Sequence, residues 1–469
     1  MSTVHDIDNE FLLRRILVWT HFAERKLTAW ELQHAVSIDP NSQEGNLVDV
    51  PDLDRMKDVS NGMLVLDEST GVFEVIGGRS LQYLATRMPD VMANTQTDIA
   101  RACVAYLKFR VFQRGMCNSD GEFETRQLAN AFHEYAACYW GHHVREAGLQ
   151  AQKATQLMSD IEPNWDRNPR QSPVNLTNFS FREYRALKQE VLRFLGGGPC
   201  FWAAVQTLKS IGPYHVKMLA TDNGRLKKDQ PVLPQYSQKV PDGMTGMHVA
   251  AWFGLADIIP GLVESEMHPD TKSSCGRTPL SLAASNGHRK TVSILVTKYR
   301  ADPRSKADRG FTPLHFAACG GHADVVQYLT DIGVDVDSYS DYGLSALSCA
   351  AMYAKEEVVR MLLNKGANVN SVEFVGHQTP LIFGVIGCSV FVVQMLLQRA
   401  ALVDAEDRSG RTALGYAADL GCEIIARMLY EAIIGDPKVL DRHHSLYGEK
   451  PLTEYGRVLM KGIVGQYKR

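Results

Sequence analysis

The sequence predicts a mainly α-helical protein that ends in a solenoid of stacked helix pairs, and two observations lead to this fold class. A short pattern recurs six times in the C-terminal half at intervals of 33 or 34 residues, which is typical of a solenoid. Apolar residues in the N-terminal half follow helical spacing, with one β-rich interruption. At 469 residues and 45% hydrophobic composition, the chain has material for about three packed domains.

Each copy of the pattern begins with Thr or Ser, which is followed in most copies by Pro or Ala and then Leu. Most copies then continue into a pair of alanines. Thr or Ser suits the cap of a first helix, Pro suits its first turn, and a later glycine can end it. An apolar stripe then predicts a second helix that faces the neighbouring copies. We therefore predict six repeats over residues 241–435, opened by Thr245, Thr278, Thr312, Ser345, Thr379 and Thr412.

The copy TPLHFAACGGHADVVQYL, from Thr312, is similar to the ankyrin consensus. The resemblance implies a fold without catalytic function that binds proteins on the concave face of a solenoid. The fifth copy departs most, because Gly384 and Val385 replace the paired alanines and Cys388 takes the glycine position. The C-terminal tail, residues 436–469, is either a cap or a degraded seventh repeat.

Four segments precede the repeats. Two helices, the second opened by a capping box of Thr28 and Glu31, are followed by the hairpin sequence NGMLVLDESTGVFEVIG. Helices with a hairpin suggest a winged-helix-like domain. We predict this domain over 8–88, a helical domain over 93–150, a linker over 151–178, and a helical segment and link over 179–240 that buttress the first repeat.

A winged helix raises the question of DNA binding, which the local charge disfavours. Residues 1–90 contain eight Lys or Arg against fifteen Asp or Glu, a balance of −7. Contact with phosphates needs concentrated positive charge. We therefore expect this domain to pack against or dock proteins, with no direct contact to nucleic acid.

A second resemblance covers most of the chain. The motifs LTAWELQHAV, NGMLVLDE, QTDIARACVAYL, YAACYWGHHVREA and YSQKVPDGMTGMHVAAWFG resemble the C-terminal half of fungal NACHT-ankyrin proteins, which are receptor-like. Those proteins usually carry an upstream phosphate-binding loop, but the sequence contains no G-x-x-x-x-G-K-[ST]. We therefore expect neither nucleotide nor any other cofactor. Gly77 and Gly78 stand where the family has a histidine-containing segment.

The stretch HEYAACYWGHH, from His133 to His143, resembles a zinc motif, but Ala137 takes the place of the second histidine. His133 and His142 are nine residues apart and fall on opposite sides of a helix. We therefore interpret the stretch as packing residues and expect no metal site. The sequence also contains no nucleophile elbow and no dinucleotide fingerprint, so we expect no enzyme activity.

The concave face of the repeats is the predicted partner-binding site. Met352, Tyr353 and Tyr342 form the patch that we select, because aromatic residues and Met are enriched at interface cores. Trp252 and Phe253 are also candidates, although packing against the preceding domain is the alternative that we favour for this pair. The full set of candidate residues is Trp252, Phe253, Phe311, Asp341, Tyr342, Met352, Tyr353, Ile386, Arg411 and Asp419.

These features are compatible with two functions. The first is an adaptor or scaffold for protein–protein interaction. The alternative is a transcription coregulator of a fungal metabolic gene cluster that binds a transcription factor instead of DNA. We expect no membrane partner, because no segment approaches the ~18 apolar residues of a membrane span, and we expect the chain in the cytoplasm or the nucleus.

The nine cysteines include no C-x-x-C pair and are interpreted as reduced thiols. Cys388 and Cys422 come from adjacent repeats. Adjacent helices lie about 8–10 Å apart, so we expect no disulfide between these two residues.

Overall fold

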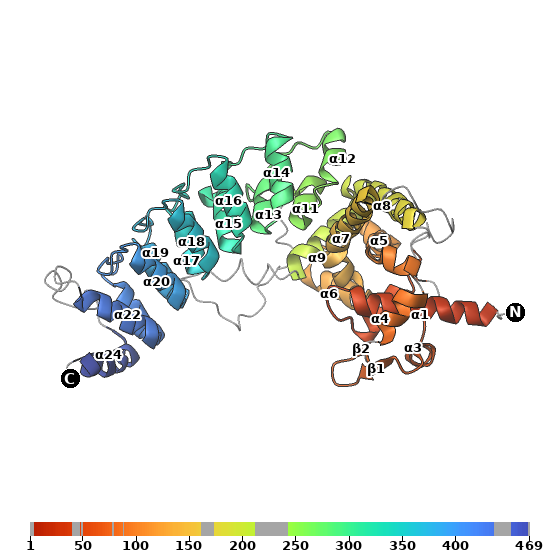
Figure 1. The fold of residues 1–469 in the computed structure, drawn as a ribbon, viewed down its shortest axis with the longest axis horizontal. Helices are drawn as coiled ribbons and strands as arrows, with labels where there is room; N and C mark the ends of the chain where they lie inside the picture. Colours follow the sequence, from red (N-terminus) through yellow and green to blue (C-terminus); the bar gives the residue numbers. More distant parts are fainter. Residues whose placement is uncertain are drawn as a thin grey trace. The chain divides into compact units, whose positions relative to one another are not determined.

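The structure is a computed structural model that describes residues 4–39, 47, 50–76, 79–87, 89–160, 173–211, 243–435 and 452–467. Figure 1 shows a mainly helical chain, as the sequence predicts. The chain divides into two compact units. The N-terminal unit lies within Met1–Pro241 and Thr245–Met267, and the C-terminal unit within Asp242–Met244 and His268–Arg469.

The first part of the N-terminal unit combines helices with one hairpin. The strands pair antiparallel, with Leu64 opposite Val75 and Asp67 opposite Val72, so the predicted hairpin is confirmed. The predicted capping box of Thr28 and Glu31 is also present. The winged-helix assignment itself stays a prediction. The elements in chain order are α1 (Val4–Phe22), α2 (Ala29–Val36), α3 (Leu53–Ser60), β1 (Leu64–Asp67), β2 (Val72–Val75) and α4 (Arg79–Arg87).

The second part of the N-terminal unit is helical and is built around a long helix, α7, which packs against α5, α8 and α9. Aromatic side chains fill the core on its first turns. Phe132 makes edge-on contacts with Trp19, at 5.2 Å between ring centroids, and with Tyr106, at 5.3 Å. The elements are α5 (Pro89–Leu107), η1 (Arg110–Arg114), α6 (Asp120–Ala129), α7 (His133–Asp160), α8 (Pro173–Leu195) and α9 (Pro199–Ile211).

The predicted linker, residues 151–178, is wrong at both ends. Helix α7 continues to Asp160, and α8 already begins at Pro173. The segment AQKATQLMSD contains good helix formers and neither Gly nor Pro, so nothing in it ends α7. Pro173 suits the first position of α8, where its missing N–H has no helical partner. Residues 161–172 lie outside the described part of the chain, as does most of the link expected before the first repeat, residues 212–242.

The first helix pair of the repeat region, α11 (Gly246–Phe253) and α12 (Ile259–Glu264), belongs to the N-terminal unit. Helix α8 approaches both helices closely. A Cβ atom at Gly246 would lie 2.1 Å from the carbonyl oxygen of Leu195, and one at Gly261 would lie 2.7 Å from the side chain of Leu192. Glycine at both positions therefore permits this close packing.

The C-terminal unit consists of helix pairs in two layers (Figure 1). The first helices of successive pairs pack side by side, and so do the second helices. The pairs are α13 (Pro279–Ser285) with α14 (Arg289–Thr297), α15 (Pro313–Gly320) with α16 (Ala323–Asp331), α17 (Ala346–Met352) with α18 (Glu356–Asn364), α19 (Pro380–Ile386) with α20 (Val390–Gln398), and α21 (Ala413–Leu420) with α22 (Glu423–Ile434). A short 3₁₀ turn, η3, covers Asp308–Gly310.

The capping residues that the sequence predicts are in place. Thr312 caps α15 in a capping box with His315, whose Nε2 also lies 2.8 Å from the carbonyl oxygen of Leu344. Gly321 then ends the helix with φ +83°. In the next two pairs the corresponding turn contains Ala354 and Cys388, both at φ +52°. A side chain in this left-handed conformation costs roughly 1–2 kcal/mol relative to glycine.

A last helix, α24 (Glu454–Tyr467), lies within the predicted C-terminal tail and packs against α21, just as α21 packs against α19. Residues 436–451 lie outside the described part of the chain. Among the described residues, no helix is both long and apolar enough to span a membrane.

Candidate interaction surface

The loops that connect successive helix pairs of the C-terminal unit are joined to one another by backbone hydrogen bonds. The amide of Asp341 donates to the carbonyl of Arg309 at 2.9 Å, and the amide of Phe374 donates to the carbonyl of Tyr342 at 2.7 Å. The amide of Arg408 donates to the carbonyl of Gly376 at 2.7 Å in the same way. The loop tips therefore form a continuous row whose members hold one another in place.

Three exposed apolar or aromatic side chains lie on neighbouring tips of this row. Tyr342 is 39% exposed, Phe374 is 61% exposed and Val375 is 56% exposed. The Phe374 ring covers Gly343, where a Cβ atom would lie 2.7 Å from the ring. Gly343 also has φ +76°, so glycine is required there for two reasons. We call Tyr342, Phe374 and Val375 the loop-tip cluster.

A buried carboxylate fixes the backbone of the tip that carries Phe374. Glu373 is only 6% exposed, and it accepts hydrogen bonds from the amides of Val375, at 2.7 Å, Gly376 and Gln378. Charge-assisted hydrogen bonds of this kind are stronger than neutral ones. The tip is therefore ordered before any partner binds.

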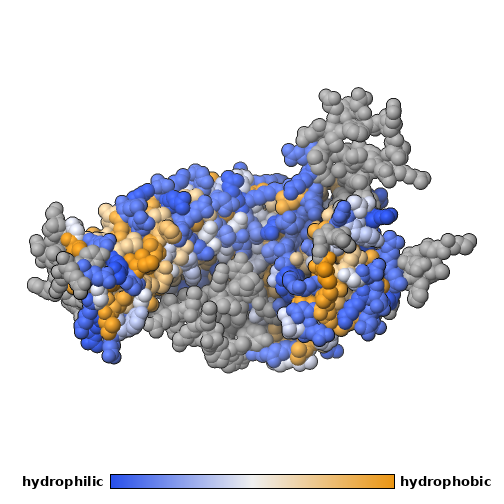
Figure 2. Space-filling view, turned by 60° about the horizontal axis from the view of Figure 1, so that its bottom comes forward, coloured by the Kyte–Doolittle hydropathy of each residue, from blue (hydrophilic) through white to orange (hydrophobic). Residues whose placement is uncertain are grey.

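Two members of the selected patch, Met352 and Tyr353, lie at the end of α17, whereas Tyr342 lies on a loop tip before this helix. Tyr353 is 38% exposed and Met352 is half-buried, as is Ile386 at the end of α19. Figure 2 shows apolar side chains gathered at the left of the view, over the C-terminal part of the C-terminal unit. Met352, Tyr353 and Ile386 are therefore partly exposed apolar or aromatic residues of the kind that a binding surface requires.

Phe311 and Asp341 lie on two earlier loops of the row. The Phe311 ring is half-buried and packs edge-on against His315, at 5.5 Å between centroids. The Asp341 carboxylate is exposed, and its Oδ1 lies 3.7 Å from Nζ of Lys306. An exposed ion pair of this length contributes little to stability, so Asp341 is available for a partner.

Trp252 and Phe253 do not lie on an exposed face, so the alternative that we favour for this pair, packing against the preceding domain, is confirmed. Phe253 is fully buried, and its ring centroid lies 5.1 Å from that of Trp140. Trp252 is 8% exposed, with Nζ of Lys209 at 3.7 Å from its ring centroid. Both side chains belong to the core of the N-terminal unit. We therefore remove them from the proposed binding surface.

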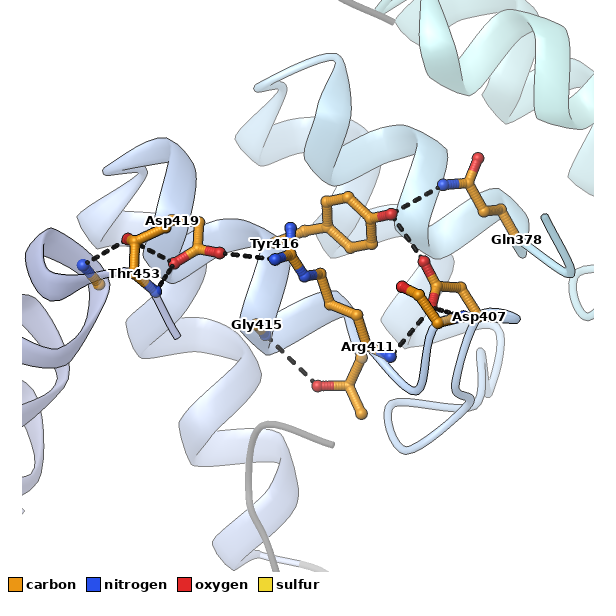
Figure 3. Close-up of polar contacts among 10 residues, drawn as sticks. Gln378, Asp407, Arg411, Gly415, Tyr416, Asp419 and Thr453 are labelled. Carbon is orange, nitrogen blue, oxygen red and sulfur yellow. Dashed lines mark hydrogen bonds and ion pairs between the residues drawn. The ribbon is translucent and has the colours of Figure 1, made fainter. Parts of the chain in front are cut away.

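Arg411 and Asp419 are also engaged within the C-terminal unit, as Figure 3 shows. The Arg411 guanidinium lies 3.1 Å from Asp419 Oδ2 and its carbon 5.0 Å from the ring centroid of Tyr416. The other carboxylate oxygen of Asp419 accepts hydrogen bonds from the amide of Thr453, at 2.9 Å, and from its hydroxyl, at 2.7 Å. These two residues hold α24 in place, so their predicted role as partner contacts is replaced by a structural one.

A second buried carboxylate, Asp407, stands beside this ion pair. It accepts a hydrogen bond from the Tyr416 hydroxyl at 2.7 Å and others from Ser409 and from the Arg411 amide. Burial raises the pKa of Asp407, but the hydrogen bonds from Ser409 and Tyr416 outweigh burial and leave the pKa below its ordinary value. Asp407 therefore fixes the last loop of the row as Glu373 fixes an earlier one.

Replacing Asp419 by alanine should loosen α24. The variant loses the Arg411 ion pair and two hydrogen bonds that Thr453 donates to the carboxylate, and a hydrogen bond to a charged group contributes about 1.5–3 kcal/mol. Amide hydrogen exchange within Glu454–Tyr467 should become roughly tenfold faster or more, because about 1.4 kcal/mol is a factor of ten. As a control, Asp331→Ala breaks an exposed ion pair with Lys365, away from α24, and should leave this exchange nearly unchanged. Equal exchange in both variants would contradict the proposed role of Asp419.

The histidines of HEYAACYWGHH lie on α7 and have separate partners. His133 stacks on Phe112, at 4.0 Å between centroids, whereas His143 lies 2.8 Å from the Tyr135 hydroxyl and 2.6 Å from Oε1 of Gln96. Burial lowers the pKa of His133 and of His143 to about 3. Within the described part of the chain, no three His, Cys, Asp or Glu side chains are arranged to hold a metal ion.

Sequence reasoning missed Phe374 and Val375, the most exposed members of the loop-tip cluster. Aligning the loops by their glycines would have found them. In the loops at Gly310, Gly343 and Gly410, the two residues directly before the glycine are Asp-Arg, Asp-Tyr and Arg-Ser. In the loop at Gly376 they are Phe and Val. Two adjacent apolar residues at an otherwise polar tip are the signal.

The fold and this row of loops define the class of the protein: it is a mainly helical protein with an ankyrin-repeat region. Residues 215–307 and 299–373 match the family model for ankyrin repeats in three copies. Among solved structures, the chain is similar to the ankyrin repeat domain of Bcl-3, described as a unique member of the IkappaB protein family. That match has 31% identity and a TM-score of 0.37, and it covers 41% of this chain and 87% of the other. A search of curated proteins gives no match.

Proposed function

We propose that this chain is an adaptor that binds another protein through the loop-tip cluster and through Met352 and Tyr353 at the end of α17. The observation that carries the proposal is the exposure of Phe374, at 61%, on a loop whose backbone is already fixed. Ankyrin repeats generally bind proteins, and solenoids of this kind present extended surfaces for that purpose.

The energetics of interfaces support this choice. A few aromatic residues near the centre of an interface usually carry most of the binding energy. Tyr342 and Phe374 are adjacent, and the bond between the Phe374 amide and the Tyr342 carbonyl fixes their spacing. Because the Glu373 carboxylate already holds the tip, binding costs little additional ordering of the loop.

The acid–base groups near this surface have structural tasks, which favours binding over catalysis. His315 caps α15 through Thr312 and bonds to the carbonyl of Leu344, and burial lowers the pKa of His315 to about 4. The carboxylates of Glu373 and Asp407 are occupied by hydrogen bonds from their own loops.

The double variant Tyr342→Ala with Phe374→Ala tests the proposal. Loss of two central aromatic contacts should weaken binding of the main partner by roughly 30-fold or more, since one such residue contributes about 2 kcal/mol or more. The full-length chain is used as bait in an affinity purification, and the partner recovered by the wild type is then titrated against the purified variants. Met352→Ala with Tyr353→Ala should also reduce recovery.

Phe391→Ala is the matched control. Phe391 is 63% exposed, as Phe374 is, but it lies on α20 in the layer of second helices. The control should bind as the wild type does, and all variants should have the circular dichroism spectrum of the wild type. Unchanged affinity of a well-folded Tyr342/Phe374 variant would refute the assignment of the surface.

The alternative function is that of a transcription coregulator. In this case the bound protein is a transcription factor, and the chain regulates a fungal metabolic gene cluster through it. The acidic balance of residues 1–90 favours action through a bound protein over direct DNA contact. A fluorescent fusion that stays in the cytosol under every growth condition would exclude this alternative while leaving the adaptor proposal intact. The resemblance to NACHT-ankyrin proteins remains part of the proposal.

A further inference from the structure

Two cysteines from successive repeats lie next to each other in the C-terminal unit. Sγ of Cys388 is 3.1 Å from Sγ of Cys422, although the residues are 34 positions apart. Cys388 lies in the turn after α19 and is exposed, and Cys422 directly precedes α22 and is half-buried. Both thiols are free, as the sequence predicts, but the helix spacing behind that prediction overestimates the distance between the two sulfur atoms. Both residues lie in turns, where side chains of neighbouring pairs approach more closely than helix axes do.

The geometry needs only a small movement to form a covalent bond. A disulfide has a sulfur–sulfur distance of about 2.05 Å, so the two atoms must approach by about 1 Å. Each cysteine is in a turn outside the helices, and Cys388 already has φ +52°, a conformation that side chains rarely adopt. We therefore expect the two turns, which lie outside the helices, to take up most of this movement.

The two thiols differ in access and chemistry. Cys388 is the exposed one, so a dissolved oxidant meets it first. Burial, together with the neighbouring Cys388 thiol, raises the pKa of Cys422 to about 12. Cys422 therefore stays protonated at neutral pH and is poorly reactive toward oxidants by itself, because the thiolate is the reactive form.

We propose that Cys388 and Cys422 form a peroxide-sensitive pair that closes reversibly to a disulfide between adjacent ankyrin repeats. In the first step, the Cys388 thiolate attacks hydrogen peroxide, the O–O bond breaks, and after proton uptake the products are a sulfenic acid on Cys388 and water. In the second step, Cys422 loses its proton as its sulfur attacks the Cys388 sulfur, which the fold holds within 3.1 Å; the S–O bond breaks, and the hydroxide leaves with that proton as water. The two thiols are thereby oxidised by two electrons, and the peroxide is reduced.

A disulfide at this position joins the turn after α19 to the start of α22. It closes a covalent loop of 34 positions and reduces the freedom of the unfolded C-terminal repeats. The proposal predicts that oxidation raises the unfolding midpoint of the C-terminal unit and that a dithiol reductant reverses the change. It does not depend on the proposed partner-binding function.

Peptide mapping of the full-length chain tests the proposal. The protein is treated with hydrogen peroxide, free thiols are alkylated, and the chain is cleaved by trypsin. Cys388 is then in the peptide 366–399 and Cys422 in the peptide 412–427, with no other cysteine in either. We expect a cross-linked species of these two peptides that lacks two hydrogen atoms and disappears after reduction. The buried Cys103 and Cys138 should become alkylated only after denaturation and serve as internal references.

Single serine variants separate the two steps. Cys422→Ser should accumulate the sulfenic acid at Cys388, which a dimedone probe traps, whereas the wild type should be trapped at least tenfold less. Cys388→Ser should leave Cys422 largely unoxidised at the same dose. Irreversibly oxidised Cys388 beside an alkylatable Cys422 in the folded wild type would overturn the proposal, as would a cross-link that joins two chains instead of one.

Discussion

Replacing Phe253 by alanine should lower the free energy of unfolding of the N-terminal unit by about 3–5 kcal/mol, the range for large-to-small changes of buried aromatics. Phe253 has no exposed surface, and its ring contacts Trp140 and His142 at centroid distances of 5.1 and 5.4 Å. It also fills the space above Gly141, where a Cβ atom would lie 2.1 Å from the ring. The truncation therefore leaves a cavity between α7 and α11.

Tryptophan fluorescence during urea unfolding measures this effect selectively. All six tryptophans lie between Trp19 and Trp252, so their emission reports on the N-terminal unit. Phe181→Ala is the matched control, because Phe181 is 53% exposed on α8 and its loss should change stability by no more than about 0.5 kcal/mol. A loss below about 1 kcal/mol for Phe253→Ala would show that the first helix pair does not share the core of this unit.

Lowering the pH from 7 to 5 should destabilise the N-terminal unit by about 2 kcal/mol for each of His133 and His143. Both side chains are fully buried, and burial lowers the pKa of each to about 3 from an ordinary value of 6.5. The unfolded chain binds a proton below pH 6.5, whereas the folded chain does so only near pH 3. Stability is therefore complete above pH 6.5 and is lost progressively as the pH falls toward 3.

The slope of unfolding free energy against pH is the decisive measurement. Each proton taken up on unfolding contributes about 1.4 kcal/mol per pH unit, so the two histidines together should contribute about twice that slope near pH 5. His143→Gln removes one titrating group but can still hydrogen-bond within the unit, and its slope should fall by about one proton. An unchanged slope in this variant would contradict the assignment of a neutral, buried His143.

Local signals were readable from the sequence because they act over a few residues. The capping box of Thr28 and Glu31 and the hairpin between Leu64 and Val75 are determined by neighbouring residues, and both are present in the structure. The TPLH cap at Thr312 is of the same kind. The linker at 151–178 was mispredicted because its Pro and Asn residues are concentrated after residue 161, while helix-forming residues extend α7 to Asp160.

The candidate site was predicted less well, because exposure depends on residues far apart in the chain. Trp252 and Phe253 occupy positions that face outward in an isolated repeat, and α7 and α9 bury them, as the favoured alternative for this pair predicts. Arg411 and Asp419 were predicted to be partner contacts, but Arg411 pairs with Asp419, and Thr453 of the C-terminal tail engages Asp419. Phe374 was not predicted because the loop at Gly376 has one extra residue before Thr379, so alignment on the threonines places His377 where the other loops have glycine.

The sequence by itself determined the helical class, the ankyrin-repeat region and the caps of its helices, because these follow from residue spacing and local hydrogen bonding. Only the tertiary structure decided which side chains remain exposed and which are brought together. Burial and contact depend on the packing of distant segments, as in the fully buried Phe253 and the 3.1 Å approach of Cys388 to Cys422. The fold class thus depends on local residue patterns, whereas the surface proposed for binding depends on tertiary packing.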